Sequence, residues 1–207
     1  MKDQAWAVPF VHSRHAGSRF IGIAIMKNHS QIADNRLHLI TGEVGKATES
    51  IDRLAFTRFR AVFDDPGQRW FFSGQGRSGL VAQMAAMRLM HAGYETHVVG
   101  EATAPAVRKN DGILLVSKSG TTPISLGFAR KARDQGALVA ALTSDASSPL
   151  AVLADASLEI PTAFSVQFAG SLFEQAALLC LDALALDISG TEAQAFIRMA
   201  NRHTNMQ

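Results

Sequence analysis

The feature that most constrains the fold is an alternation of short apolar runs with longer amphipathic segments. The alternation starts after residues 64–67, Asp-Asp-Pro-Gly, whose residue types favour a turn. Beyond that turn, five apolar runs predict β-strands, and the segments between and after them have the apolar spacing of helices. The predicted strands are 69–72, 96–99, 112–116, 138–142 and 157–160, and the predicted helices are 77–92, 123–135, 148–154 and 170–186.

Strands that alternate with helices imply a parallel sheet that is covered on both faces. We therefore predict an α/β fold, a three-layer αβα sandwich with a five-stranded parallel sheet. Right-handed crossovers would place all the strand-to-helix loops along one edge of that sheet. Ligands bind such sheets beyond the carboxyl ends of the strands, near a topological switch point, so a binding site is expected there.

The segment that precedes the sheet has a helical pattern from residue 28 to residue 63, which predicts a long N-terminal helix or helices. Gly42 and Gly45 predict a break or bend near its middle. At the other end of the chain, the polar residues 190–207 predict a short helix and a frayed end. The expected division is an extension at 1–27, one domain at 28–190 and a tail at 191–207.

Residues 1–27 fit this plan poorly, and two interpretations remain open. They form either an ordered extension that packs on a neighbouring subunit, or an upstream stretch that precedes a start at Met26. His12 and His15 in this stretch have no evident set of partner ligands, so no metal site is expected here.

Composition narrows the classes of function. The chain has 207 residues with a net charge of +2, and it lacks a run of five basic residues, so a nucleic-acid partner is not expected. The single cysteine, Cys180, excludes an intrachain disulfide and a multi-cysteine metal cluster, and its apolar surroundings predict a buried thiol. Neither a membrane span nor a signal-peptide core is evident, so we expect a cytoplasmic protein without membrane contact.

A hydroxyl-rich loop follows the third predicted strand and points to a phosphate site. Gly120 lets the backbone approach an anion closely, and the first turn of the next helix leaves N–H groups unpaired near the same place. The spacing does not fit a nucleotide P-loop, which favours a small phosphorylated metabolite as ligand. The loop offers the hydroxyls of Ser117, Ser119, Thr121 and Thr122, together with the positive charge of Lys118.

A second glycine-rich loop, residues 73–80, follows the first predicted strand. Gly74 and Gly76 either form only a tight turn into the next helix, or they open a site in which Arg77 and Ser78 hold an anionic or polyhydroxyl ligand. A nicotinamide cofactor is not expected, because no acidic residue closes the next predicted strand.

Motifs in nearly every loop between about Asn28 and Ile188 resemble the 6-phospho-3-hexuloisomerases, which belong to the sugar isomerase (SIS) domain group with its flavodoxin-like sheet. The resemblance implies interconversion of D-arabino-3-hexulose 6-phosphate and fructose 6-phosphate through an enediol(ate), without cofactor or metal. It lies in 74–82 (GQGRSGLVA), 87–93 (MRLMHAG), 98–105 (VVGEATAP), 143–150 (TSDASSPL) and 173–175 (FEQ).

The resemblance also implies residue roles. Glu174 is implied as the base, although a glutamate in the first turn of a helix is favoured there by the helix dipole alone. His91 is implied to reach the site of a neighbouring subunit, although a histidine near a helix C-terminus is, from the sequence alone, more often a capping or packing residue. Arg77 would stabilise negative charge or else form a surface salt bridge. Glu101 and Thr103, after the second predicted strand, are expected to contact the sugar chain, unless Glu101 is only a turn residue. The other residues implied to bind substrate are Gly76, Ser78, Ser117, Lys118, Ser119, Thr121 and Thr122.

The phosphate loop departs from the usual Ser-Gly-Ser-Gly-Glu-Thr of that family at two positions, Lys118 and Thr121, and in this it is closer to the loop of bacterial phosphoglucose isomerases. The hydroxyl pattern survives, but the sugar is left open. The alternatives are a pentose or heptose phosphate isomerase and a non-catalytic sugar-phosphate sensor. The resemblance implies a homo-oligomer, either a dimer or a tetramer.

Overall fold

The structure is a computed structural model that describes residues 18–206; side chains are described from residue 32 onward, except residue 33. His12 and His15 lie outside the described residues. The chain divides into two compact units between Thr41 and Gly42, inside the first helix. The sheet and the loops at its carboxyl edge belong to the unit that begins at Gly42.

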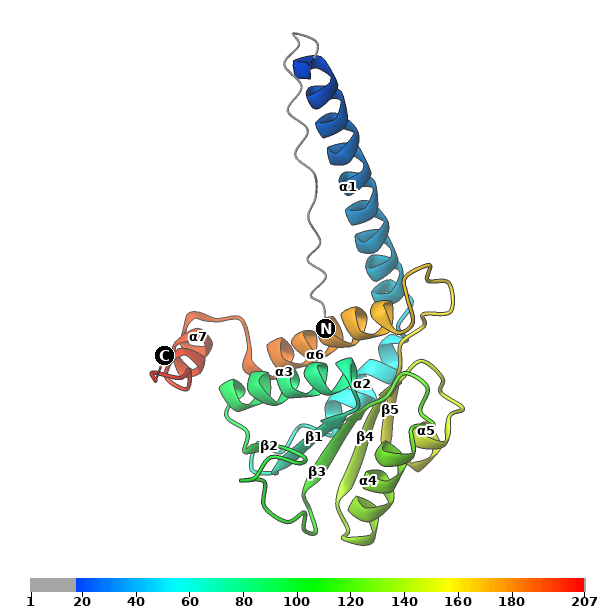
Figure 1. Ribbon diagram of the computed structural model, residues 1–207. Coiled ribbons are helices and arrows are strands. Elements are labelled where there is room, and N and C mark those ends of the chain that lie inside the picture. The colour runs from blue at the N-terminus through cyan, green and yellow to red at the C-terminus, as the bar shows by residue number, and fades with distance from the viewer. Residues whose placement is uncertain (1–17, 207) are drawn as a thin grey trace, which may run out of the picture. The chain divides into compact units, whose positions relative to one another are not determined.

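The five predicted strands are confirmed, and each lies within two residues of its expected bounds. They form one parallel sheet in the order β2-β1-β3-β4-β5 (Figure 1). The strands are β1 Trp70–Gly74, β2 Thr96–Val98, β3 Gly112–Val116, β4 Leu138–Thr143 and β5 Ala156–Glu159.

Helices cover both faces of the sheet, as predicted (Figure 1). One face packs against α2, α3 and α6, and the other against α4 and α5. The helices are α1 Ser18–Glu49, α2 Arg53–Ala61, α3 Arg77–Ala92, α4 Pro123–Asp134, α5 Pro149–Leu153, α6 Ser171–Ser189 and α7 Ala193–Ala200.

Alternation along the strands explains why the sheet has two buried faces. In β1, Trp70 and Phe72 point to the α3–α6 side, whereas Phe71 points to the α4–α5 side. β3 alternates in the same way, and all five of its residues are buried. Successive residues of a strand face opposite sides, so only a continuous apolar run can fill both cores. The predicted buried thiol is also confirmed, since Cys180 lies in the core and its burial raises the pKa to about 12.

The expected break in the N-terminal helical segment was placed wrongly. The helix α1 continues through Gly42 and Gly45 and ends at Glu49, and residues 50–52 separate it from the next helix. There Asp52 caps α2 by accepting a hydrogen bond from the backbone N–H of Ala55 at 2.5 Å. A glycine costs a helix about 1 kcal/mol without ending it, whereas a well-placed N-cap starts a new one.

Within the part of the chain that the structure describes, no helix combines the length and apolar character needed to cross a bilayer. The same residues contain no group of three metal-ligating side chains close enough to share an ion.

Candidate active site

The two glycine-containing loops singled out in the sequence lie side by side. β1 lies between β2 and β3, so the chain leaves β1 on one side for β2 and returns on the other side for β3. Gly74, at the end of β1, is in register with Val116, at the end of β3. This is the switch point of the sheet, where ligands of such folds bind.

A pocket of about 210 Å³ opens between these two loops. Hydroxyl groups of both loops face it, and Ser78 and Ser117 are themselves buried. The pocket is therefore shaped for a small anion with several oxygen atoms, because hydroxyls and helix N-terminal N–H groups donate to such groups. It is lined by Gln75, Ser78, Val116, Ser117, Lys118, Ser119 and Thr122.

The hydroxyls of the phosphate loop are paired with one another. Oγ of Ser117 lies 3.2 Å from Oγ1 of Thr122. Thr121 donates both its backbone N–H, at 3.2 Å, and its hydroxyl, at 2.9 Å, to Oγ of Ser119. Thr121 does not itself line the pocket, but its hydrogen bond orients the hydroxyl of Ser119, which does.

The backbone of this loop is fixed by the loop after β4. The carbonyl of Lys118 accepts hydrogen bonds from the hydroxyl of Thr143 at 3.0 Å and from the backbone N–H of Ser144 at 2.9 Å. Gly120 has φ +61°, and a Cβ at this position would lie only 2.1 Å from Oγ of Ser148. Only glycine fits here, so the shape of the loop depends on this residue.

The other loop brings the start of α3 against β1. A Cβ at Gly74 would lie 2.5 Å from the carbonyl oxygen of Ser78, so the strand and the helix touch through backbone alone. Gly76 has φ +59° and lies outside the pocket lining. Gly74, Gly76 and Gly79 have the Gly-x-Gly-x-x-Gly spacing of dinucleotide-binding loops. The tight turn and the close packing of strand against helix explain this spacing without a dinucleotide.

Glu174 lies in the first turn of α6, and its carboxylate faces the start of α3. Nε of Arg77 lies 2.7 Å from Oε2 of Glu174, and the Glu174 side chain is only 16 % exposed. Among the residues that the structure describes, this buried oxygen has no hydrogen-bond partner, so its contact with Arg77 is an ion pair. Arg77 thus forms a salt bridge, but with the predicted base rather than with a distant surface group.

Lys118 lies against the same helix start. Its Nζ donates to the carbonyl of Ala169 at 3.0 Å. A Cβ at Gly170 would lie 3.0 Å from Oε1 of Glu174 and 3.5 Å from Cδ of Lys118, so the side chains of these two residues flank Gly170. The carboxylate therefore has a cation from each of the two loops nearby.

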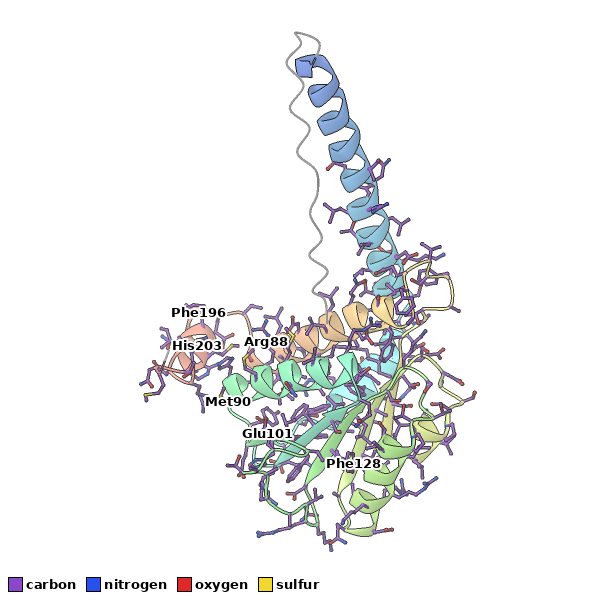
Figure 2. All side chains as sticks on the ribbon, in the orientation of Figure 1. Arg88, Met90, Glu101, Phe128, Phe196 and His203 are labelled. Carbon is purple, nitrogen blue, oxygen red and sulfur yellow. The ribbon has the colours of Figure 1, made fainter. Side chains whose placement is uncertain are left out.

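His91, Glu101 and Thr103, like Gly76 and Thr121, do not line this pocket. His91 is fourteen residues beyond Arg77 on α3, which is about 21 Å along the helix. Its ring is buried and stacks on His203 at a centroid distance of 5.3 Å; burial, helped by His203 and Arg88, lowers its pKa. Glu101, which is labelled in Figure 2, and Thr103 are exposed in the loop after β2, the edge strand. Neither residue lines the pocket.

Sequence reasoning missed Gln75 as a lining residue and Ala169 as the partner of Lys118. Gln75 stands between two glycines of a loop already identified, so its position was a usable signal. Ala169 acts through its backbone carbonyl, and no side-chain pattern reveals that. The assembled site can bind a phosphate-sized anion and can hold a carboxylate base near it, with cations to balance negative charge.

Comparisons with known proteins identify the family to which the chain belongs. The SIS domain family matches residues 66–186. The chain is 40% identical to a 3-hexulose-6-phosphate isomerase from Mycobacterium gastri, over 84% of this chain and 90% of that protein. It is 36% identical to a protein of the same name from Bacillus subtilis, over 66% of this chain and 79% of the relative.

The fold of the chain also matches a solved structure. The fold matches a hypothetical protein from Methanococcus jannaschii with a TM-score of 0.70 and 26% identity, over 84% of this chain and 99% of the other. A molecular function of 3-hexulose-6-phosphate isomerase has been inferred for that protein.

Proposed function

Because the chain belongs to the SIS domain family, we propose that it is a phosphosugar isomerase that interconverts 3-hexulose 6-phosphate and fructose 6-phosphate. The observation that carries the proposal is the place of Glu174. Its carboxylate is largely buried, is paired with Arg77, and lies beside a hydroxyl-lined pocket of the size that a phosphate group needs.

The reaction moves a carbonyl group from C3 to C2 of the sugar. A base removes the proton from C2, the electrons form an enediolate across C2 and C3, and the proton is delivered to C3 while a hydroxyl proton moves from O2 to O3. We assign the base to Glu174, with the enediolate charge balanced by Arg77 and Lys118. A base positioned within reach of the carbon-bound proton and fixed positive charges are what such a step requires.

The phosphate is assigned to Ser78, Ser117, Ser119 and Thr122, whose residues line the pocket. Thr121 supports Ser119, and Gly76 permits the turn that presents Ser78. Glu101 and Thr103 are retained as candidate contacts to the far end of the sugar chain, since they follow β2 at the same edge of the sheet. Phosphate binding holds the substrate so that its reacting carbons lie near Glu174.

We also propose a homo-oligomer in the cytoplasm. Leu80, Met84 and Met87 recur on one side of α3 and are exposed, as are Leu179 and Leu186 on α6, and such apolar faces favour contact between subunits. His91 would join an active site only across such a contact. A cytoplasmic location fits a charged sugar phosphate, because its charge prevents passage through a bilayer.

The test is an assay of the purified protein with 3-hexulose 6-phosphate, with fructose 6-phosphate detected through its further enzymatic conversion. Formation of fructose 6-phosphate supports the proposal. A panel of pentose and heptose phosphates run beside it decides between this substrate and the alternatives. Binding of a sugar phosphate without turnover of any member of the panel would instead support a sensor.

A further inference from the structure

The loop that joins β5 to α6, residues 160–170, is hydrogen-bonded to α1 through the carboxylate of Glu43. Glu43 accepts three hydrogen bonds from this loop, and each comes from a different residue. The donors are the hydroxyl of Ser165 at 2.8 Å, the backbone N–H of Val166 at 2.8 Å and Nε2 of Gln167 at 3.0 Å. A carboxylate has enough lone pairs for all three, and bonds to a charged acceptor are stronger than neutral ones.

Two further observations support this attachment. Nζ of Lys46, one turn beyond Glu43 on α1, lies 4.2 Å from the centre of the Phe164 ring, a cation–π distance. The hydrogen bond from the Val166 N–H, with those from Gln167 and Ser165, lowers the pKa of Glu43, so its carboxylate stays charged at neutral pH. We refer to Glu43, Lys46 and their loop partners 164–167 as the α1 clamp.

The far end of the same loop lies in the candidate active site. Ala169 has φ +53°, a conformation that a residue with a side chain adopts only when its surroundings hold it there. Its carbonyl accepts from Lys118, and the carbonyl of Gly170 accepts the backbone N–H of Glu174 at 3.0 Å. The loop therefore ends by setting where α6 begins and, with it, where the Glu174 carboxylate lies.

We propose that Glu43 is a positioning residue for the isomerase reaction: by fixing residues 164–167, it holds Ala169 and Gly170 so that Lys118 and Glu174 keep their places. This rests on the proposed function of the site. Glu43 does not line the phosphate pocket, and of the pocket residues only Lys118 bonds to the loop that Glu43 holds, so we expect a larger effect on the reacting groups than on phosphate binding.

The test compares Glu43→Ala with Glu49→Ala, which removes an exposed glutamate from the same helix. Glu49 has no hydrogen bond to the loop among the residues that the structure describes. Glu43→Ala is expected to lower kcat about tenfold, because displacing reacting groups by a fraction of an ångström costs rate. The Kd for inorganic phosphate should stay within about twofold, since the phosphate loop is anchored separately to the loop after β4.

Glu43→Gln keeps an oxygen that accepts from Val166 and should restore part of the lost kcat. A kcat for Glu43→Ala equal to that of Glu49→Ala overturns the proposal. If Glu43→Ala does not fold, Glu43→Gln decides in its place, because a kcat unchanged from the wild type then overturns the proposal as well.

The same variants separate a failure of this inference from a failure of the proposed function. If the wild type converts no sugar phosphate in the panel, the function is wrong, and the positioning effect is read from amide hydrogen exchange. Faster exchange at the start of α6 in Glu43→Ala, but not in Glu49→Ala, supports the link between the α1 clamp and Glu174. Unchanged exchange there overturns it.

Discussion

Two arginine–carboxylate pairs connect the same two helices, α3 and α6, yet they differ in surroundings. Arg77 pairs with Glu174 at 2.7 Å, and Arg88 pairs with Asp182 at 2.9 Å. In the first pair the carboxylate is 16 % exposed and lies beside the phosphate pocket. In the second it is 35 % exposed and lies near the far end of α3, where Figure 2 labels Arg88.

The comparison teaches that the ion pair itself does not identify a site. Both pairs have good distances, and an exposed pair contributes little to stability. What distinguishes Arg77 and Glu174 is their place at the carboxyl edge of the sheet, beside the loops after β1 and β3. If this position matters for function, substitutions in the Arg77–Glu174 pair will lower activity far more than those in the Arg88–Asp182 pair.

The largest difference is expected between the two carboxylates. Glu174→Gln should lower kcat about 10³-fold, because the amide cannot take up the C2 proton. Asp182→Asn should leave kcat within about twofold, since it lies away from the pocket. Steady-state rates with hexulose 6-phosphate measure both, and phosphate binding to Glu174→Gln checks that its pocket is intact. Equal effects would remove the distinction between the two pairs.

The second largest difference in activity is expected between variants of the two arginines. Arg77→Gln is expected to lower kcat/KM about 100-fold, because Glu174 loses its ion-pair partner and the enediolate loses a cation. Arg88→Gln should change kcat/KM less than about threefold and lower the free energy of unfolding by at most about 1 kcal/mol. The measurement is kcat/KM together with urea unfolding. A wild-type rate in Arg77→Gln would contradict its assignment.

The phosphate loop beside the first pair provides a third test. Gly120→Ala should raise KM about tenfold and destabilise the protein by about 1–3 kcal/mol, because the new Cβ meets Oγ of Ser148 in a left-handed backbone conformation. Gly127→Ala is the matched control, because a Cβ there meets nothing within 4 Å on α4. It should leave KM unchanged and stabilise the helix by about 0.5–1 kcal/mol. A normal KM in Gly120→Ala would show that the loop shape is not needed.

The smallest effect is expected at the far end of α3. Burial, together with His203 and Arg88, lowers the pKa of His91, so the unfolded chain binds a proton there that the folded chain does not. The contribution of neutral His91 to the free energy of unfolding is complete above the ordinary histidine pKa. It is lost as the pH falls through the folded-state pKa, with a slope of at most about 1.4 kcal/mol per pH unit. His91→Gln should lose less stability than the wild type between pH 7 and pH 5, as followed by urea unfolding. Identical pH dependence in both would contradict it.

Much of the fold was predictable from the sequence because strand and helix periodicity are local properties. The all-apolar run at β3 predicted a strand buried on both faces, and the turn at 64–67 marked where the sheet begins. The glycines at 42 and 45 do not end α1, because glycine lowers helix propensity without breaking a helix, whereas Asp52 caps the start of α2. The cap is a local signal, since Asp52 bonds to a backbone N–H only three residues further along the chain.

The candidate site was predictable in its parts. The hydroxyls of 117–122 and the glutamate at 174 stood out by residue type and by their place at element ends. The sequence did not show that Arg77, Lys118 and Glu174 lie close together, because they belong to three segments separated by 41 and 56 residues. The α1 clamp was invisible for the same reason.

By itself, the sequence determined the class of fold and the two glycine-containing loops that border the candidate site, because periodicity and residue type act over a few neighbours. Only the tertiary structure decided which arginine faces Glu174, that His91 lies a helix length away, and that α1 reaches the loop before Glu174. Those facts depend on the strand order β2-β1-β3-β4-β5 and on helix packing, which bring distant segments together through contacts that no local pattern encodes.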